Sequence, residues 1–391
     1  MTAAVQVVHP PGYAPERAYA ARVLLGELLG LEHTVEEGPV SAWELHCDGG
    51  TVTIPDVLFQ TPPGDWLTPA TLPAGPGLYG DDLFGTAFFL LTRYEELALA
   101  DRDEHDRFPA EATRSDLDRA QVDDCAEALL QALRTVAPRL EPRRRPFRVV
   151  PSHDVDYPRL TPHLRLSFLR HGNLWAARPT DPFDTFDRLM DASERRGLRA
   201  AFYFLADAAP YSLEERGIRA LLEKIHVRGH EIGLHGSYAT FRDPAKLKAE
   251  LELLVRVCAE EGIEQDEWGG RQHFLRWECP TTWQAYEEAG LAYDTTLGYS
   301  ARPGFRTGTC HEYPVYDLRA RRELRLRERP LVLMDTPTLD RLELPDGELE
   351  RLIGRLRDEC RRVHGDFTVL WHNNWLVTSR QRRLFDSALG S

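Results

Sequence analysis

Asp154 and Asp156 are the two residues of this chain whose types and spacing best suit chemistry. They end the apolar segment 147–156. In an extended backbone, side chains two residues apart point the same way, so the carboxylates can share a divalent ion or divide ligand and base roles. His153 points to the opposite side and is expected to support the site or pack in the core. An Asp-x-Asp after a strand also serves as a turn or helix cap, so the pair needs partners elsewhere.

Segment 229–238 supplies the second cluster. Its sequence, Gly-His-Glu-Ile-Gly-Leu-His-Gly-Ser-Tyr, predicts a strand that ends at His235, where a neutral imidazole can bind a metal. His230 lies at the start of this strand and is expected to have a structural hydrogen-bonding role. Tyr238 follows the strand end and is a candidate for substrate binding. His235 is therefore the strongest imidazole ligand in the sequence.

Arg271 and His273 form the third cluster, in the segment 269–274. The two-residue spacing places both side chains on one side of an extended strand. An arginine next to an aspartate such as Asp154 lowers the pKa of that aspartate and fixes its orientation. His273 can complete a metal shell or contact the substrate. The alternative is a buried arginine salt bridge with the histidine as packing.

The last cluster surrounds His372, which lies between Trp371 and Trp375. A histidine at a strand end can act as a general acid, and Asp335 at the end of the preceding predicted strand can hold its imidazolium form. Asp294 competes with Asp335 for that role. The two tryptophans can stack on a sugar face or close the barrel by packing.

Short apolar segments alternate with helical ones from residue 147 onward, which predicts parallel strands. The predicted strands are 147–154, 199–206, 231–236, 267–274, 291–298, 329–336 and 367–373. The predicted helices are 182–197, 214–228, 243–261, 280–289 and 346–364. Every cluster falls at the C-terminal end of a strand, where the loops of barrel-type α/β enzymes converge. Seven strands instead of eight indicate an incomplete or distorted, seven-stranded (β/α) barrel.

The N-terminal part reads as a smaller α/β domain. The predicted elements are a helix at 15–31, a hairpin of 43–47 and 51–59 around Asp48-Gly49-Gly50, a helix at 83–99, and a helix to Val136 with Ser115 as N-cap. A charged segment between two prolines marks the boundary. The expected organisation is a small domain at 1–140, a linker at 141–146 and a barrel domain at 147–391.

Composition narrows the possible functions. The 391 residues include 48 basic and 62 acidic ones, and the net charge of -14 argues against a general role in holding nucleic acid or anionic membranes. The arginine-rich segment 319–329 is read as a solvated face or linker. Six cysteines without a CxxC pair indicate reduced thiols. No signal peptide and no apolar run of ~20 residues is recognised, so a cytoplasmic location is expected. The oligomeric state is left open.

These clusters, in this order, make residues 147–375 resemble the polysaccharide deacetylase (NodB homology) superfamily of metal-dependent carbohydrate esterases. The resemblance implies a catalytic base at Asp154 and a metal-binding aspartate at Asp156. It also implies a metal-binding histidine at His235, after the run Gly-His-Glu-Ile-Gly. Segments 82–96 and 103–108 resemble an uncharacterised bacterial domain found ahead of such deacetylase-like domains.

The resemblance assigns the later clusters as well. It implies the third-motif arginine at Arg271 and the general acid at His372, with Asp335 as the aspartate that tunes this acid. The sequence departs from the family at Ala239, where the second ligand histidine is expected. His273 is the first candidate to replace that ligand, and His311 is the second.

The function expected from this resemblance is that of a metal-dependent hydrolase, with zinc as the expected ion, which removes an acetyl group from an N-acetylated sugar or glycan precursor. Two alternatives stay open. One is hydrolysis of small linear or cyclic amides, as in allantoinase-like relatives. The other is a non-catalytic barrel protein that has lost a metal ligand at Ala239.

Overall fold

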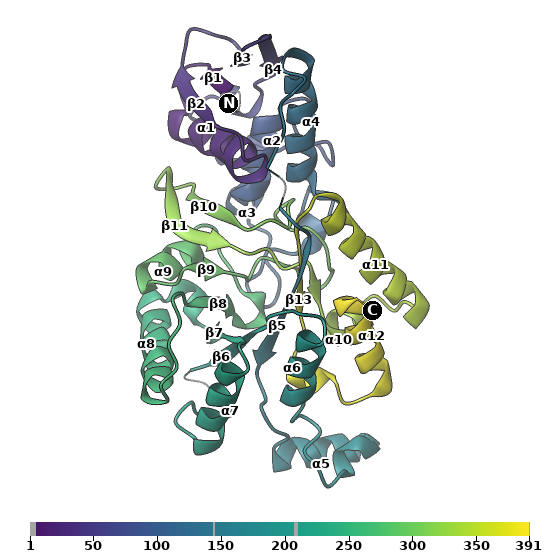
Figure 1. Cartoon of the computed structure of the whole chain (residues 1–391). Helices are drawn as coiled ribbons and strands as arrows, with labels where there is room; N and C mark the ends of the chain where they lie inside the picture. The colour runs from purple at the N-terminus through teal and green to yellow at the C-terminus, as the bar shows by residue number, and fades with distance from the viewer. Residues whose placement is uncertain (1–4, 144, 207–209, 391) are drawn as a thin grey trace.

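Two separate β-sheets form the frame of the protein (Figure 1). The computed structural model describes residues 5–143, 145–206 and 210–390; the other positions, which include residue 144 of the predicted linker, lie outside the described residues. A four-stranded sheet lies at one end of an elongated molecule. A larger, curled sheet with helices around its outside occupies the rest. The chain is therefore a mixed α/β protein with two sheet systems.

The small sheet has the strand order β2-β1-β3-β4. Its strands are β1 (Val5–His9), β2 (His33–Glu37), β3 (Trp43–Cys47) and β4 (Gly50–Ile54). Three helices pack with it: α1 (Ala14–Ala21), which continues as a π-helix to Leu28, α2 (Leu83–Leu91) and α4 (Gln121–Val136). The hairpin and first helix predicted from sequence are confirmed. The hairpin turn needs a glycine at Gly49, because a Cβ there would lie 1.9 Å from the Val136 carbonyl oxygen.

Two helix predictions in this part are wrong in detail. The helix expected at 83–99 is interrupted at Arg93, whose φ of 54° is left-handed, and resumes as α3 (Tyr94–Ala98). The buried Arg93 guanidinium spans this break, because it binds Glu95 and Glu96 of α3 and the Leu90 carbonyl of α2. Ser115 is not an N-cap, because α4 begins only at Gln121.

The large sheet has nine strands in the order β10-β11-β9-β8-β7-β6-β5-β13-β12. The strands are β5 (Arg148–Val155), β6 (Ala201–Leu205), β7 (Glu231–Gly236), β8 (Gly269–Gln272), β9 (Tyr293–Asp294), β10 (Tyr313–Asp317), β11 (Arg322–Glu328), β12 (Leu333–Met334) and β13 (Asp366–Leu370). All neighbours pair in parallel except β10 and β11, which are antiparallel. The order starts at β10 and ends at β12, so the sheet is open and curled like part of a barrel.

Each of the seven predicted strands contains or overlaps an observed strand, but the predicted number is not confirmed. The two additional strands are β10 and β11. Strand β11 falls within the arginine-rich segment that was read as a solvated face or linker. Burial alternates along this strand: Leu324, Leu326 and Glu328 are buried, and the residues between them are more exposed. The charged residues on its outer face concealed this period of two.

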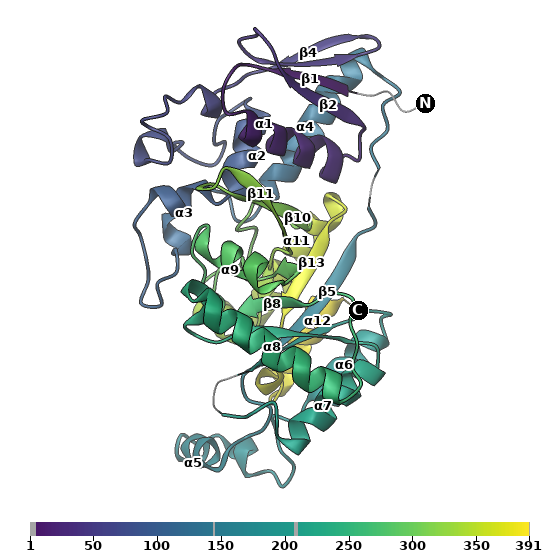
Figure 2. The same ribbon diagram turned by 90° about the vertical axis from the view of Figure 1, so that its left-hand side faces the viewer.

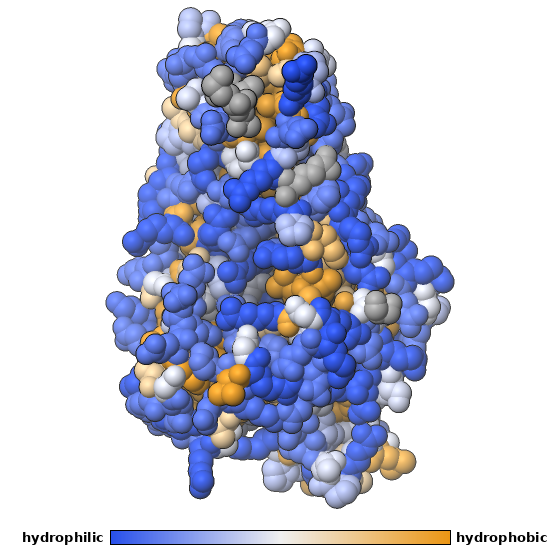
Figure 3. Space-filling view, viewed as in Figure 1, coloured by the Kyte–Doolittle hydropathy of each residue, from blue (hydrophilic) through white to orange (hydrophobic). Residues whose placement is uncertain are grey.

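Helices cover the outside of the large sheet. They are α6 (Phe186–Glu194), α7 (Arg216–Val227), α8 (Pro244–Glu260), α9 (Thr281–Ala289), α11 (Asp346–Arg362) and α12 (Ser379–Leu389). The first five confirm the predicted helices, and α12 was not predicted. Two short helices, α5 (Pro162–Arg170) and α10 (Thr336–Arg341), follow β5 and β12. The face drawn in Figure 3 is largely hydrophilic, with limited apolar patches.

The two sheet systems share one continuous hydrophobic core. The Tyr19 hydroxyl of α1 donates to the Pro314 carbonyl of β10 at 2.8 Å, and Tyr313 donates to the Leu91 carbonyl at 3.0 Å. The N-terminal part is thus packed firmly against the side of the large sheet. Among the described helices, none combines the length and apolarity needed to cross a membrane.

Candidate active site

The chemical clusters converge at the C-terminal ends of β5, β7, β8 and β13. There they line one pocket of 190 Å³. Its walls include five of the ionisable residues singled out from the sequence, which are Asp154, Asp156, His235, His273 and His372. The parallel arrangement explains the convergence, because it brings the C-terminal strand ends to one edge of the sheet. The remaining lining residues are Arg107, Phe274, Leu275, Ser300, Met334, Arg341, Leu370 and Trp375.

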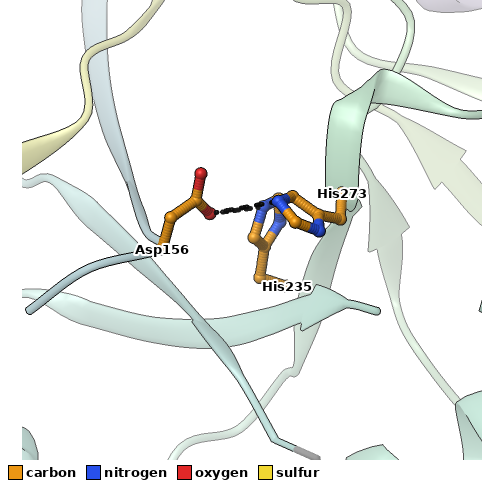
Figure 4. Close-up of side chains that lie close together, drawn as sticks. All are labelled: Asp156, His235 and His273. Carbon is orange, nitrogen blue, oxygen red and sulfur yellow. Dashed lines mark ion pairs between the residues drawn. The ribbon is translucent and has the colours of Figure 1, made fainter. Parts of the chain in front are cut away.

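Asp156, His235 and His273 form a group that could hold a metal ion. One ligand atom from each lies within 4.8 Å of the others. The Asp156 Oδ1 atom is 3.3 Å from His235 Nε2 and 3.6 Å from His273 Nε2, and Figure 4 shows both rings facing this carboxylate. Of the two replacement ligands considered for the position of Ala239, the structure brings His273 to the site.

The orientation of His235 also suits a metal ligand. Its Nδ1 atom lies 2.9 Å from the backbone oxygen of Arg271, which can only accept a hydrogen bond, so Nδ1 carries a proton and Nε2 is the nitrogen that can bind a cation when the ring is neutral. Within the described part of the chain, neither His235 Nε2 nor Asp156 Oδ1 has a hydrogen-bond partner, although both atoms are buried. Two imidazoles and one carboxylate are a donor set that zinc accepts. These residues therefore fit a divalent cation.

Electrostatics keep Asp156 ionised. Burial alone would raise the pKa of this carboxyl, but the neighbouring His235, His273 and His372 imidazoles hold it well below its ordinary value. An ionised carboxylate is the form that binds a cation.

Arg271 fixes Asp154 beside this group. Its Nη1 donates to Asp154 Oδ1 at 2.7 Å, and its other nitrogens donate to Ser152 Oγ and to the Thr295 backbone oxygen, both at 2.9 Å. Burial would raise the pKa of Asp154, but the Arg271 guanidinium together with the His235 and His372 imidazoles outweighs burial and lowers it. The second oxygen, Oδ2, is 3.7 Å from His235 Nε2. One oxygen of this carboxylate is thus engaged by the arginine, and the other faces the possible metal ligands.

Asp335 holds His372 on another side of the pocket. The Asp335 Oδ2 atom accepts the backbone N–H of His372 at 2.7 Å and lies 2.9 Å from its Nδ1. The Nε2 atom then points toward Asp156, with 3.7 Å to Oδ2. Burial would lower the pKa of His372, but the Asp335 carboxylate and the two site aspartates raise it to about 10. Asp294, the competing candidate, instead accepts hydrogen bonds from Thr296.

The three aromatic residues expected to bind substrate occupy different environments. Trp375 lines the pocket. Tyr238 is 41% exposed, and its hydroxyl lies 3.1 Å from His105 Nδ1. Trp371 is fully buried, packs on Phe385 and donates its indole N–H to the Trp375 carbonyl. Because a fully buried ring has no free face for a ligand, Trp371 is a core residue and its expected stacking role is corrected.

The other histidines lie outside the pocket. His153 is buried against Phe202, and burial lowers its pKa to about 3. His230 accepts the Ala200 N–H at 3.1 Å, a structural contact at the start of β7. His311 lies in a separate cavity, where its Nε2 is 3.2 Å from Asp123 Oδ1. His311 therefore does not belong to the metal-capable group.

Sequence reasoning missed several residues of the pocket wall. Arg107 comes from the N-terminal part of the chain, and its Nη1 donates to the Phe274 carbonyl at 2.8 Å. Phe274 and Arg341 also line the pocket, and the Phe274 side chain is 45% exposed. No periodicity or motif in the sequence indicates that a loop before residue 140 reaches this edge of the sheet.

A larger cavity, of 870 Å³, lies at the opposite, N-terminal ends of the same strands. Its polar wall consists mainly of arginines and a few carboxylates, which are Arg148, Arg196, Arg199, Arg329, Arg357, Arg361, Glu231, Glu312 and Asp366. Among the described residues, the metal-capable group is found in the smaller pocket and not here. We therefore place the candidate chemistry in the smaller pocket.

Comparisons with known proteins give distant likenesses. Residues 6–138 match the model of a family of unknown function, DUF7033. No curated protein matches the chain. The solved structures it is similar to include a putative polysaccharide deacetylase from Mycobacterium smegmatis, with 17% identity and a TM-score of 0.44 over 63% of this chain and 84% of that one.

Two further structures show similar coverage. A probable polysaccharide deacetylase from Pseudomonas aeruginosa PAO1 has 14% identity and a TM-score of 0.41 over 64% of this chain and 87% of its own. The Puue allantoinase has 12% identity and a TM-score of 0.40 over 63% of this chain and 83% of its own. We infer the function from the residues of this chain itself.

Proposed function

We propose that this chain is a cytoplasmic, metal-dependent hydrolase that removes an acetyl group from an N-acetylated sugar or glycan precursor. One observation carries the proposal. A carboxylate fixed by an arginine, Asp154, and an imidazolium fixed by an aspartate, His372, share a pocket with the group Asp156, His235 and His273. Amide hydrolysis needs a base for water and an acid for the departing amine, and this arrangement supplies a candidate for each.

Asp156, His235 and His273 would hold the ion, for which zinc is our choice. When bound, a divalent ion supplies Lewis acidity for an amide carbonyl and lowers the pKa of water. The two buried ligand atoms that lack a hydrogen-bond partner in the described chain support this assignment.

Asp154 is the proposed base. Its lowered pKa keeps it ionised at neutral pH, so Oδ2 can accept a proton from the attacking water. Arg271 keeps Oδ1 engaged and thereby fixes the direction of Oδ2.

His372 is the proposed acid. An amine leaves an acyl carbon readily only once its nitrogen is protonated, and the raised pKa of His372 keeps a proton available on Nε2. The contact with Asp335 leaves Nε2 as the ring nitrogen that faces the pocket.

The shape of the pocket bears on the substrate. Phe274 and Trp375 give it aromatic surface, which suits the apolar face of a sugar ring. A second cavity of 180 Å³ shares Arg107, Leu275, Ser300 and Arg341 with it, so a substrate larger than the first pocket has somewhere to extend. The first pocket alone, at 190 Å³, is small for a ligand site, and this favours hydrolysis of a small amide as the second candidate.

A substrate panel tests the proposal. Zinc-loaded protein is incubated with N-acetylated hexosamine oligosaccharides, with allantoin and with simple acetamides, and the release of acetate or ring-opened product is measured. Acetate release from the sugars supports the deacetylase, and turnover of the small amides alone favours the second candidate. Zinc-loaded protein that hydrolyses none of these amides contradicts both.

A further inference from the structure

The loop that follows α3 reaches from the N-terminal part to the candidate active site. Figure 2 shows it running from the region of the small sheet down beside the helices of the large one. Its residues 103–107 contact the turn 273–276, which follows β8 directly. The first residue of that turn is His273, a member of the metal-capable group. The position of this histidine therefore depends on how the turn is held.

The turn itself has an unfavourable backbone conformation. Phe274 and Leu275 have φ values of 62° and 53°, so two consecutive residues with side chains lie in the left-handed region. Such residues are strained and persist only where surrounding contacts enforce their conformation. His273 comes immediately before this strained pair. The turn therefore needs contacts from outside to present His273 in one orientation.

Arg107 provides the most direct of these contacts. Its Nη1 donates to the Phe274 carbonyl at 2.8 Å, and its side chain is largely buried. Asp103 fixes the arginine, because it accepts the Arg107 Nε–H at 2.8 Å and also the backbone N–H groups of His105 and Arg107. Asp103 and Arg107 thus form a rigid unit with one donor aimed at the strained turn.

Arg276 ties the other end of the turn to the same loop. Its Nε donates to the His105 carbonyl at 2.7 Å, and its Nη2 donates to Asp106 Oδ2 at 3.0 Å. The His105 ring lies 4.8 Å from the Phe274 ring. Both flanks of the turn are therefore fastened to the loop of the N-terminal part.

We propose that Asp103 and Arg107 are positioning residues for the metal ligand His273, and that the N-terminal part of the chain thereby completes the metal site. The inference rests on the proposed metal-dependent function. It gives this part a chemical role in addition to packing, because a turn released from Arg107 can leave the left-handed region and move His273 away from Asp156.

Cobalt titration of the full chain tests this positioning role, because bound Co²⁺ has a visible absorption spectrum that depends on its ligands. The variants are Arg107→Met, Asp103→Asn and His273→Ala, each checked for a native circular dichroism spectrum. We expect Arg107→Met and Asp103→Asn to weaken the Kd for Co²⁺ by about 10–100-fold, which is typical for partners that orient a ligand. Their cobalt spectra should shift toward that of His273→Ala.

Arg102→Met is the matched control. Arg102 lies in the same loop but donates to the carbonyls of Glu96 and Leu99, not to the turn. Its Kd for Co²⁺ should equal that of the wild type. Equal weakening in the control would show general destabilisation and overturn the positioning role.

Two further outcomes separate this inference from the proposed function. A wild type that binds one Co²⁺ together with unchanged Kd values in Arg107→Met and Asp103→Asn would overturn the positioning role alone. A wild type that binds no Co²⁺ would overturn the metal site and the positioning role together.

Discussion

The two ends of the large sheet differ in what the same strands present. At the N-terminal ends the cavity is large, at 870 Å³, and its arginines mostly meet carboxylates or backbone oxygens near solvent. At the C-terminal ends the pocket is only 190 Å³, but carboxylates and imidazoles face one another there away from solvent. The volume of a cavity is therefore a poor guide to its chemistry in this protein. The orientation of buried polar groups is a better guide. Matched substitutions at the two ends of the sheet test this difference.

The largest difference between the ends should appear in activity. Asp154→Asn at the C-terminal end removes the proposed base, so hydrolysis should fall by roughly 10²–10⁴-fold. Metal stoichiometry, measured by plasma mass spectrometry, should stay unchanged because Asp154 is not a proposed ligand. Asp366→Asn at the N-terminal end is the matched control and should retain activity. Near-full activity of Asp154→Asn would remove Asp154 from the mechanism.

Stability should separate the two ends as well. Arg271→Met leaves the buried Asp154 carboxylate without its partner, and we expect a loss of about 3–5 kcal/mol in the free energy of unfolding. Arg148→Met breaks the ion pair with Asp366, where the Arg148 side chain is 60% exposed, and should cost about 0–1 kcal/mol. Urea unfolding measures both. Equal losses in the free energy of unfolding would show that the buried ion pair of Arg271 contributes no more to stability than the exposed ion pair of Arg148.

A smaller, pH-dependent effect on stability is expected from Asp294, the buried last residue of β9. Burial raises the pKa of Asp294 to about 7, whereas its ordinary value is 3.8. The folded chain therefore keeps a proton on Asp294 that the unfolded chain releases. The free energy of unfolding then falls as pH rises from about 4 to about 7, by up to ~1.4 kcal/mol per pH unit.

Asp294→Asn cannot titrate and should lose this dependence. Relative to the wild type, the variant should be more stable at pH 7 than at pH 5 in urea unfolding. The neighbouring Glu328, whose pKa is also raised by burial and by Asp294, gives a pH dependence of the same sign in both proteins, so the test is the difference between variant and wild type. An identical difference from the wild type at both pH values would contradict the raised pKa of Asp294.

Much of the large sheet could be predicted because its strands are short, apolar and separated by helices. β5, β7, β8 and β13 carry Asp, His and Arg residues at their ends, and the two-residue period of a strand places them on one side. β11 was missed because charged residues conceal its alternation, and β10 because it is short, contains Pro314 and is buried at every position, so it has no alternation to detect. An incomplete barrel was expected, but the place where the sheet opens could not be predicted, since closure depends on pairing between distant strands and not on any local pattern.

The residues of the candidate site also fall into two groups, those that local sequence patterns predict and those that they do not. Asp154, Asp156, His235 and Arg271 follow from spacing within their own strands. Arg107 does not, because the contact with Phe274 joins residues 167 positions apart and depends on how the N-terminal part docks. The burial of Trp371 was equally hidden, because a tryptophan beside a site histidine looks the same in sequence whether it faces the pocket or the core.

The most direct test of the proposed metal site is anomalous scattering from crystals of the full chain grown with zinc. We expect one ion bound by Asp156, His235 and His273, at the C-terminal ends of the strands. An empty pocket, or an ion held elsewhere, such as beside His311 and Asp123 or in the arginine-lined cavity, would contradict the proposed site.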